Sequence, residues 1–189
     1  MEKISIVGLD LAKNTIQLHA ACADGSVSLR RRISRGKLLQ FLSTIDRCTV
    51  AMEACAGSHH WGREIAKLGH TVRLIAPIYV KPFVKRQKND AADAEAICEA
   101  AMRPTMRFVA VKSETRQASA AVFKVRDLLV RQKTQIINAL RGQMAEFGVV
   151  VPQGSAHVGT LIADVEDPHS ALPEPARLPC LALFPRCAR

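Results

Sequence analysis

The order of the predicted strands is the feature that most constrains what this sequence can fold into. Residues 4–9 (ISIVGL) form a compact apolar run rich in β-branched side chains, which is typical of a buried central strand. Residues 15–21 alternate as a second strand, Asp24 and Gly25 predict a hairpin turn, and residues 27–33 return as a third strand. The first strand is therefore expected to have an antiparallel neighbour.

Alternating helices and strands follow this hairpin region. Residues 36–45 and 58–67 have helical spacing, and residues 48–52 (CTVAM) and 71–75 are short apolar strands. The resulting order is three hairpin-linked strands followed by helix, strand, helix and strand. This order predicts an α/β fold with a mixed sheet and flanking helices.

The second half of the chain is predicted to be mainly helical. We expect a helix over residues 90–102, a short strand over 108–111, and one long helix over 113–147 that Gly148 ends. After Asp167 the chain holds five of its nine prolines and shows no periodicity, so we expect disorder there. The expected domains are residues 1–111, a long coiled-coil-like helix over 112–148, and a linker with a Pro-rich tail over 149–189.

Four acidic residues are predicted at positions where a carboxylate is costly unless a cation or another partner balances its charge. Asp10 ends the first buried strand and Glu53 ends the fourth, so the two would emerge side by side if these strands are neighbours. Asp90 and Asp93 are three residues apart on one face of a predicted helix. Such a cluster would repel itself without a cation, and Mg²⁺ or Mn²⁺ suits carboxylate oxygens. Two such ions can clamp the attacking and leaving oxygens of a phosphodiester.

Each acid also has a simpler interpretation. Asp10 could close a turn, and Glu53 could be one of the many acids found at strand ends. Asp90 could cap its helix, while Asp93 could be a first-turn acid that the helix dipole favours. The metal site is favoured by the combination of the four and not by any one residue.

The positive charge of the chain points to a polyanionic partner. The formal net charge is +10, and nucleic acid is the first candidate for such a partner. Aromatic residues make up only 4% of the chain, which argues against binding of single strands mainly by base stacking. Arg35 and Lys37 lie in one of two basic runs that flank the acids. The residues predicted to contact nucleic-acid phosphates are Lys13, Arg30, Arg31, Arg32, Lys81, Lys85, Arg86 and Lys88.

Cysteine usage and hydropathy indicate the compartment. None of the six cysteines forms a Cys-x-x-Cys pair, and no Cys/His grouping has zinc-ligand spacing. No secretory pattern and no apolar run of membrane-spanning length is present. We therefore expect a cytoplasmic chain with free thiols and no membrane partner.

Four segments, in order, closely resemble the DEDD transposases, which are insertion-sequence recombinases related to the Piv DNA invertases. The segments are residues 8–13 (GLDLAK), 52–55 (MEAC), 88–94 (KNDAADA) and 141–148 (RGQMAEFG). The resemblance covers residues 4–159, and the lysine-asparagine-aspartate stretch is its most specific part.

The resemblance implies a ribonuclease-H-like (RuvC-like) domain in which Asp10, Glu53, Asp90 and Asp93 hold two Mg²⁺ ions and act on DNA. It also implies that the long helix is a coiled coil that pairs copies into a dimer or tetramer. Some members of the family are guided by a structured RNA, so a guide RNA is an additional partner that the resemblance implies.

The chain departs from the family pattern at its C-terminal end. Family members carry a further domain with a serine nucleophile, and neither Ser155 nor Ser170 lies in a matching context. We expect that domain to be missing, and the tail after Asp167 to be unlike the family. Two alternatives therefore stay open: a non-catalytic partner that binds DNA and oligomerises, and a hydrolytic nuclease resembling a Holliday-junction resolvase. An actin-like ATPase is disfavoured because no second glycine-rich phosphate loop follows Glu53.

Overall fold

The computed structural model describes residues 3–85 and 90–187. The chain divides into two compact units, Met1–Arg116 and Gln117–Arg189. Among the helices of the described residues, none is long and apolar enough to cross a membrane.

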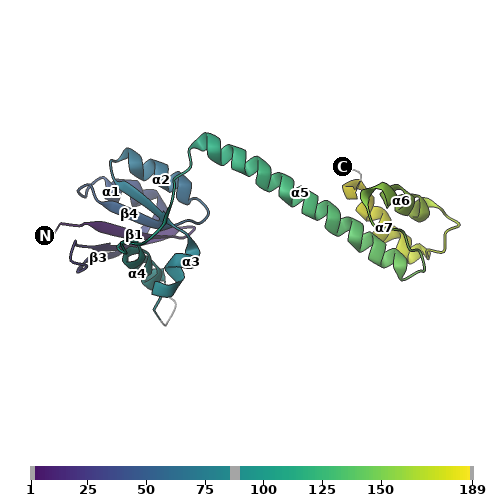
Figure 1. Ribbon diagram of the computed structural model, residues 1–189, viewed down its shortest axis with the longest axis horizontal. Helices are drawn as coiled ribbons and strands as arrows, with labels where there is room; N and C mark the ends of the chain where they lie inside the picture. The colour runs from purple at the N-terminus through teal and green to yellow at the C-terminus, as the bar shows by residue number, and fades with distance from the viewer. Residues whose placement is uncertain (1–2, 86–89, 188–189) are drawn as a thin grey trace. The chain divides into compact units, whose positions relative to one another are not determined.

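The first unit is built on one mixed sheet (Figure 1), and its strand order is β3-β2-β1-β4-β5-β6. β1 pairs with β2 in antiparallel fashion, and β2 pairs likewise with β3. β4 is parallel to β1, β5 is parallel to β4, and β6 is antiparallel to β5. This is the ribonuclease-H-like α/β arrangement that the sequence predicts. The strands are β1 (Ile6–Leu11), β2 (Thr15–Ala21), β3 (Val27–Ser34), β4 (Thr49–Glu53), β5 (Thr71–Ile75) and β6 (Phe108–Val109).

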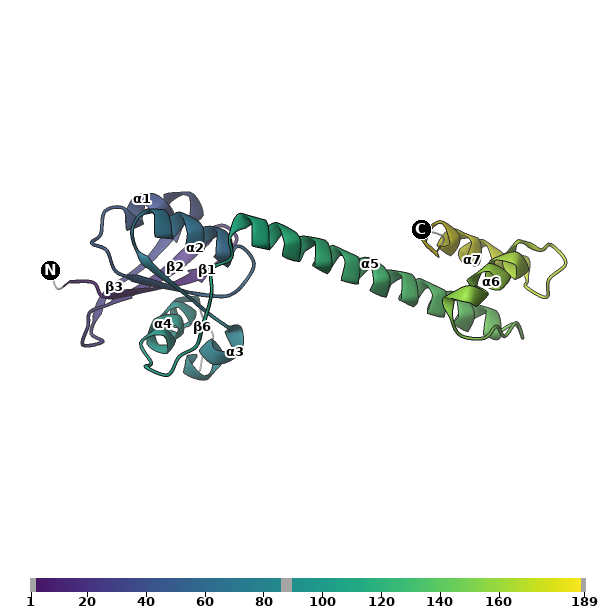
Figure 2. The same cartoon turned by 45° about the horizontal axis from the view of Figure 1, so that its top comes forward.

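Helices cover both faces of this sheet. In Figure 2, α1 (Leu38–Leu42) and α2 (Ser58–Lys67) lie on one face, and α4 (Asp90–Ala101) lies on the other. Side chains alternate across β1 accordingly. Val7 and Leu9 belong to the core under α1 and α2, whereas Ile6 belongs to the core under α4. The remaining short helices of this unit are η1 (Arg35–Lys37), α3 (Pro77–Val80) and η2 (Lys81–Phe83).

The long helix is confirmed as α5 (Glu114–Ala145), which is followed by Gly148 at a left-handed φ of 82°. Its middle section exposes large apolar side chains. Val122, Val125 and Leu129 are 68%, 55% and 58% exposed, respectively. The last turns differ, because Leu140 and Met144 are fully buried in a core of their own.

The prediction of a disordered tail is wrong. The structure shows η3 (Ser155–His157), α6 (Val158–Glu166) and α7 (Glu174–Cys187). Leu161 and Val165 from α6, together with Leu172, pack against the end of α5. Two short helices joined by a loop leave no extended periodicity to detect. Some of the prolines fall at helix ends: Pro168 follows α6, and Pro173 and Pro175 flank the start of α7, where a proline ring is tolerated.

A buried arginine also orders this tail. The Arg177 guanidinium donates to the carbonyl oxygens of Val165 (2.6 Å), Leu172 (3.2 Å) and Asp167. It also donates to the Ser170 hydroxyl at 3.2 Å. One side chain of α7 thus satisfies the backbone of the loop that leads into the helix.

Candidate functional site

Two of the predicted metal ligands lie at the same end of two neighbouring parallel strands. Asp10 is the fifth residue of β1, and Glu53 is the last residue of β4. The parallel register pairs Leu9 with Met52, so Asp10 and Glu53 follow on adjacent strands. Both side chains are half-buried.

Both acids also share the face of the sheet that α4 covers. Alternation along β1 places Asp10 on the same face as Ile6, and alternation along β4 places Glu53 on the same face as Ala51. Ile6 and Ala51 belong to the core that packs under α4. The two carboxylates therefore emerge at the edge of that core.

Helix α4 brings the other two acids toward this edge. Its first residue is Asp90, and Asp93 lies in its first turn and is half-buried. The end of the helix approaches the β2–β3 hairpin, because an added Cβ at Gly25 would lie 3.5 Å from the Met102 side chain. That hairpin is at the opposite end of β1, so the start of α4 lies toward Asp10.

Close packing of α4 on β1 depends on Gly8. A Cβ added to Gly8 would lie 2.7 Å from the backbone nitrogen of Cys98 and would also meet the Ala94 carbonyl oxygen. Only a residue without a side chain lets the helix backbone lie directly on the strand. Gly8 is two residues from Asp10, and Ala94 directly follows Asp93, so this contact sets the spacing between the two acids.

Asp10 and Glu53 lie at adjacent strand ends, and Asp93 lies in the first turn of the helix that covers this face. Among the side chains that the structure describes, of which Asp90 is not one, no three His, Cys, Asp or Glu come together as a metal site. The donor set itself, carboxylates on a sheet edge and a helix end, suits a hard divalent cation. The assignment of the four acids as ligands stays a prediction.

The pKa of the Cys55 thiol is affected by both strand-end carboxylates. Burial raises the pKa of this thiol, and the negative charges of Glu53 and Asp10 raise it further. The neighbouring Arg35 acts in the opposite direction on the same pKa. Cys55 is thus kept protonated, which argues against its acting as a nucleophile.

Arg35 belongs to one of the basic runs that were predicted to flank the acids, but it was not among the predicted phosphate contacts. Its guanidinium donates to the carbonyl oxygen of Ala12 at 3.1 Å and stacks over the Trp61 ring at 5.0 Å. Trp61 is only 7% exposed and belongs to the core under α1 and α2. The sequence signal available was modest: Arg35 is the residue directly after β3, in a basic run.

The predicted basic residues are divided between the two faces of the sheet. Arg30 pairs with Glu95 at 3.0 Å, and Lys85 pairs with the same carboxylate at 2.5 Å. Arg31 lies over the Phe41 ring on the opposite face, at 5.5 Å. Arg30 and Lys85 therefore already have an acidic partner within the chain.

The other predicted phosphate contacts have different surroundings. Arg32 donates to the Thr15 hydroxyl at 3.4 Å. Lys13, in the turn after β1, and Lys81, in η2, are exposed. Arg86 and Lys88 lie outside the described residues.

The comparison with known families settles the ancestry of this arrangement. A family model described as a transposase, that of the DEDD transposases of the IS110 group, matches residues 7–148. This chain belongs to the DEDD transposase family. The match begins within β1 and extends past α5, so the whole sheet and the long helix are family features.

Two relatives show how far the likeness extends. The transposase for insertion sequence element IS1328 of Yersinia enterocolitica is 46% identical over 178 residues, which is 94% of this chain and 53% of that protein. A probable family 20 transposase of Pseudomonas aeruginosa is 47% identical over 177 residues, covering 93% and 51%. The DEDD transposase chain thus spans about half the length of the curated relatives it matches.

The matched length also corrects the expectation that the tail is foreign to the family. Because 178 of the 189 residues are matched, the likeness must continue past Asp167. The likeness to other DEDD transposases therefore extends into the Pro-rich segment.

Among solved structures, the chain resembles T. thermophilus RuvC in complex with Holliday junction substrate. The TM-score is 0.40 at 12% identity, and the likeness covers 55% of this chain and 98% of that one. The fold assignment rests on the strand order and not on this likeness.

Proposed function

We propose that residues 1–111 form the catalytic-carboxylate domain of a DNA transposase that cuts and joins DNA phosphodiesters. The observation that carries this proposal is the meeting of Asp10 and Glu53 at one end of adjacent parallel strands. Helix α4 begins at that same end with Asp90 and Asp93 in its first turn. Membership of the DEDD transposase family supports the same proposed function.

Two Mg²⁺ or Mn²⁺ ions are the cofactors that this donor set would hold, through Asp10, Glu53, Asp90 and Asp93. When bound, such ions activate the attacking oxygen and neutralise charge on the leaving oxygen. The protein supplies rigid positions for the carboxylates, since two of them lie on central strands and two on a helix pressed against Gly8.

Cationic side chains near the acids would hold the DNA backbone. Arg35 is fixed by Ala12 and Trp61, so its guanidinium is preorganised for a phosphate oxygen. Lys13 is exposed three residues after Asp10. These two residues are proposed as the phosphate contacts closest to the reaction, and Arg32 and Lys81 are proposed as further contacts.

We further propose that residues 112–148 pair copies of the chain into a dimer or tetramer. The exposed apolar residues Val122, Val125 and Leu129 are spaced by three and four, as in a helix-pairing seam. A guide RNA is a further partner that the net charge of +10 would suit.

Calorimetric titration with Mg²⁺ or Mn²⁺ tests the metal site. The parent chain is compared with an Asp10→Asn, Asp93→Asn variant and with an Asp46→Asn, Asp127→Asn control. The control removes the same charge from exposed positions. We expect binding by the parent and the control and none by the site variant.

If the parent chain alone binds no metal ion, the titration is repeated with DNA present. This repeat separates a site that DNA completes from a wrong assignment of the acids. Binding that appears only with DNA would show that the substrate completes the site. No binding in either case, with the fold intact, would overturn the proposed roles of the acids.

A second candidate is a non-catalytic partner that binds DNA and oligomerises. It is favoured by the net charge of +10 and by the exposed apolar side chains of α5. Incubation with branched or end-sequence DNA separates the two. Cleavage that Asp10→Asn abolishes supports the catalytic function, whereas binding without cleavage supports the second candidate. Release of cleaved strands without joining would point instead to a hydrolytic nuclease.

A further inference from the structure

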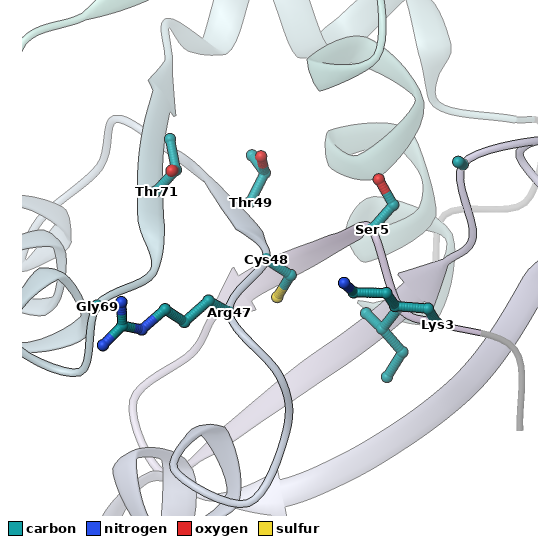
Figure 3. Close-up of a pocket in the computed structure, with 9 residues that line it drawn as sticks. Lys3, Ser5, Arg47, Cys48, Thr49, Gly69 and Thr71 are labelled. Carbon is teal, nitrogen blue, oxygen red and sulfur yellow. The ribbon is translucent and has the colours of Figure 1, made fainter.

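A cavity of about 400 Å³ opens at the end of the sheet opposite to the carboxylates (Figure 3). It lies where β1, β4 and β5 begin, and the hydroxyl-bearing residues Ser5, Thr49 and Thr71 line it. The backbone nitrogens of Thr49 and Thr71 already donate to neighbouring strands. The side-chain hydroxyls are therefore the groups that this wall offers to a ligand.

Two cations stand on either side of this cavity. Lys3 and Arg47 both line it and are exposed, and no acidic side chain is among the lining residues. Among the residues that the structure describes, neither Lys3 nor Arg47 forms an ion pair or a side-chain hydrogen bond, so their charge is uncompensated there. Figure 3 shows the Lys3 side chain extending toward Cys48 and Arg47 extending toward Gly69.

Arg47 is held close to the backbone. A Cβ added to Gly69 would lie 2.8 Å from Nε and 3.2 Å from Cζ of Arg47. Gly69 has a φ of 89°, a conformation that L side chains rarely adopt. The glycine thus leaves room for the guanidinium to lie flat against the chain, with its remaining N–H groups free to face a ligand.

The floor of the cavity carries no negative charge. The Cys48 thiol lies 3.6 Å from Nδ1 of the buried His70, whose Nε2 lies 3.0 Å from the carbonyl oxygen of Leu42. Burial, followed by the charge of nearby Asp46, raises the pKa of Cys48 to about 11. The thiol therefore stays neutral at physiological pH and does not repel an anion.

We propose that this cavity binds a backbone phosphate of a nucleic-acid strand, between Lys3 and Arg47 and against the hydroxyls of Ser5, Thr49 and Thr71. This proposal rests on the proposed function for the presence of nucleic acid. It places a second contact away from the carboxylates, because five residues of β1 at roughly 3.3 Å each separate the two ends of the sheet. That separation is about five nucleotide steps of 3.4 Å, so the phosphate held here is not the one being cut.

Fluorescence anisotropy with a labelled oligonucleotide, measured from low to high salt, tests the proposal. The full chain is compared with a Lys3→Ala, Arg47→Ala variant and with a Lys67→Ala, Arg107→Ala control. Both variants remove two exposed cations from the first unit. We expect roughly tenfold weaker binding for the cavity variant, and a salt-dependence slope smaller by about two contacts. The control should change affinity much less.

If the cavity variant and the control variant lose the same affinity for the oligonucleotide, the loss reflects net charge alone and the proposal is overturned. Lys3 acetylation, followed by mass spectrometry, gives a readout that does not depend on a variant. Bound oligonucleotide should protect Lys3 and leave Lys67 reactive. No protection of Lys3 by a bound oligonucleotide would also overturn the proposal.

A competition with inorganic phosphate shows whether the cavity binds a nucleic-acid strand or only a small anion. If millimolar phosphate protects Lys3 as well as the oligonucleotide does, and the cavity variant binds the oligonucleotide normally, the cavity is a small-anion site and not a strand contact. An Asp10→Asn, Glu53→Gln variant separates the two proposals. It should keep the cavity contact even if the proposed metal function fails, whereas a parent chain that binds no nucleic acid would overturn both.

Discussion

Gly8 shows how a single residue sets the position of helix α4 on the sheet. Sequence reasoning located the four acids, but it gave no reason for helix α4 to lie against β1. The reason is the absence of a side chain at Gly8, where any Cβ would meet the backbone of Cys98 and Ala94. A contact between segments so distant in sequence cannot be inferred from local spacing.

Replacing Gly8 with alanine should therefore push α4 away from the sheet. We expect a loss of about 2–3 kcal/mol in the free energy of unfolding, as for other overpacked cores. Urea denaturation measures it, and Gly36→Ala is the matched control because nothing lies within 4 Å of a Cβ added there. A Gly8→Ala variant as stable as the control would show that α4 is not held at this contact.

His19 should make the stability of the first unit depend on pH. It is 5% exposed in β2, and Nδ1 has no hydrogen-bond partner within the residues described. Burial lowers its pKa from 6.5; Glu95 opposes this shift, whereas Arg30 and Lys85 add to it. Because the unfolded chain takes up the proton more readily, stability is full above about pH 6.5 and falls as the pH drops through the lowered pKa.

Comparison with a His19→Gln variant isolates this effect from other titrating groups. Denaturation at pH 7.5 and at pH 5.5 should show a larger loss for the parent than for the variant. His157→Gln, at an exposed position, serves as the control and should behave as the parent does. Equal pH dependence in the parent and in His19→Gln would mean that His19 is not held neutral.

At the scale of elements, the sequence predicted each helix or strand whose own residues show a clear period or a turn. The apolar run before Asp10, the hairpin turn at Asp24 and the long helix ended by Gly148 were all predictable, because strand and helix periods and turn residues are local. The α6–α7 segment was not. Its order comes from Leu161 and Leu172 packing on the end of α5, and from Arg177 binding loop carbonyls.

The basic residues near the site also show that local sequence signals do not identify the partner of a side chain. A run such as Arg30 to Arg32 looks uniform in the sequence, yet alternation along β3 sends Arg31 to Phe41 and Arg30 to Glu95. Arg35 follows the strand and so escapes this alternation, which is why it lies beside the acids. Sequence spacing could identify the charge but not the partner of each residue.

At the scale of the whole molecule, the two units carry different parts of the family signature. Three of the four motif stretches surround the sheet and α4, and the fourth, residues 141–148, ends α5. The tail covers the last turns of α5, where Leu140 and Met144 are buried. The middle of α5 has no such cover, so its exposed apolar residues are the part of the molecule that a second copy would bury.

Self-association through α5 should therefore be sensitive to charge on the exposed seam. We expect sedimentation velocity to show a dimer or tetramer for the parent chain, and a Val125→Glu, Leu129→Glu variant to sediment as a monomer because glutamates in an apolar helix seam oppose pairing. Gln132→Glu, Gln135→Glu adds the same charge at exposed polar positions of α5 and should leave the oligomer intact. A parent that is monomeric at all concentrations, or a seam variant that still assembles, would show that copies do not pair through this helix.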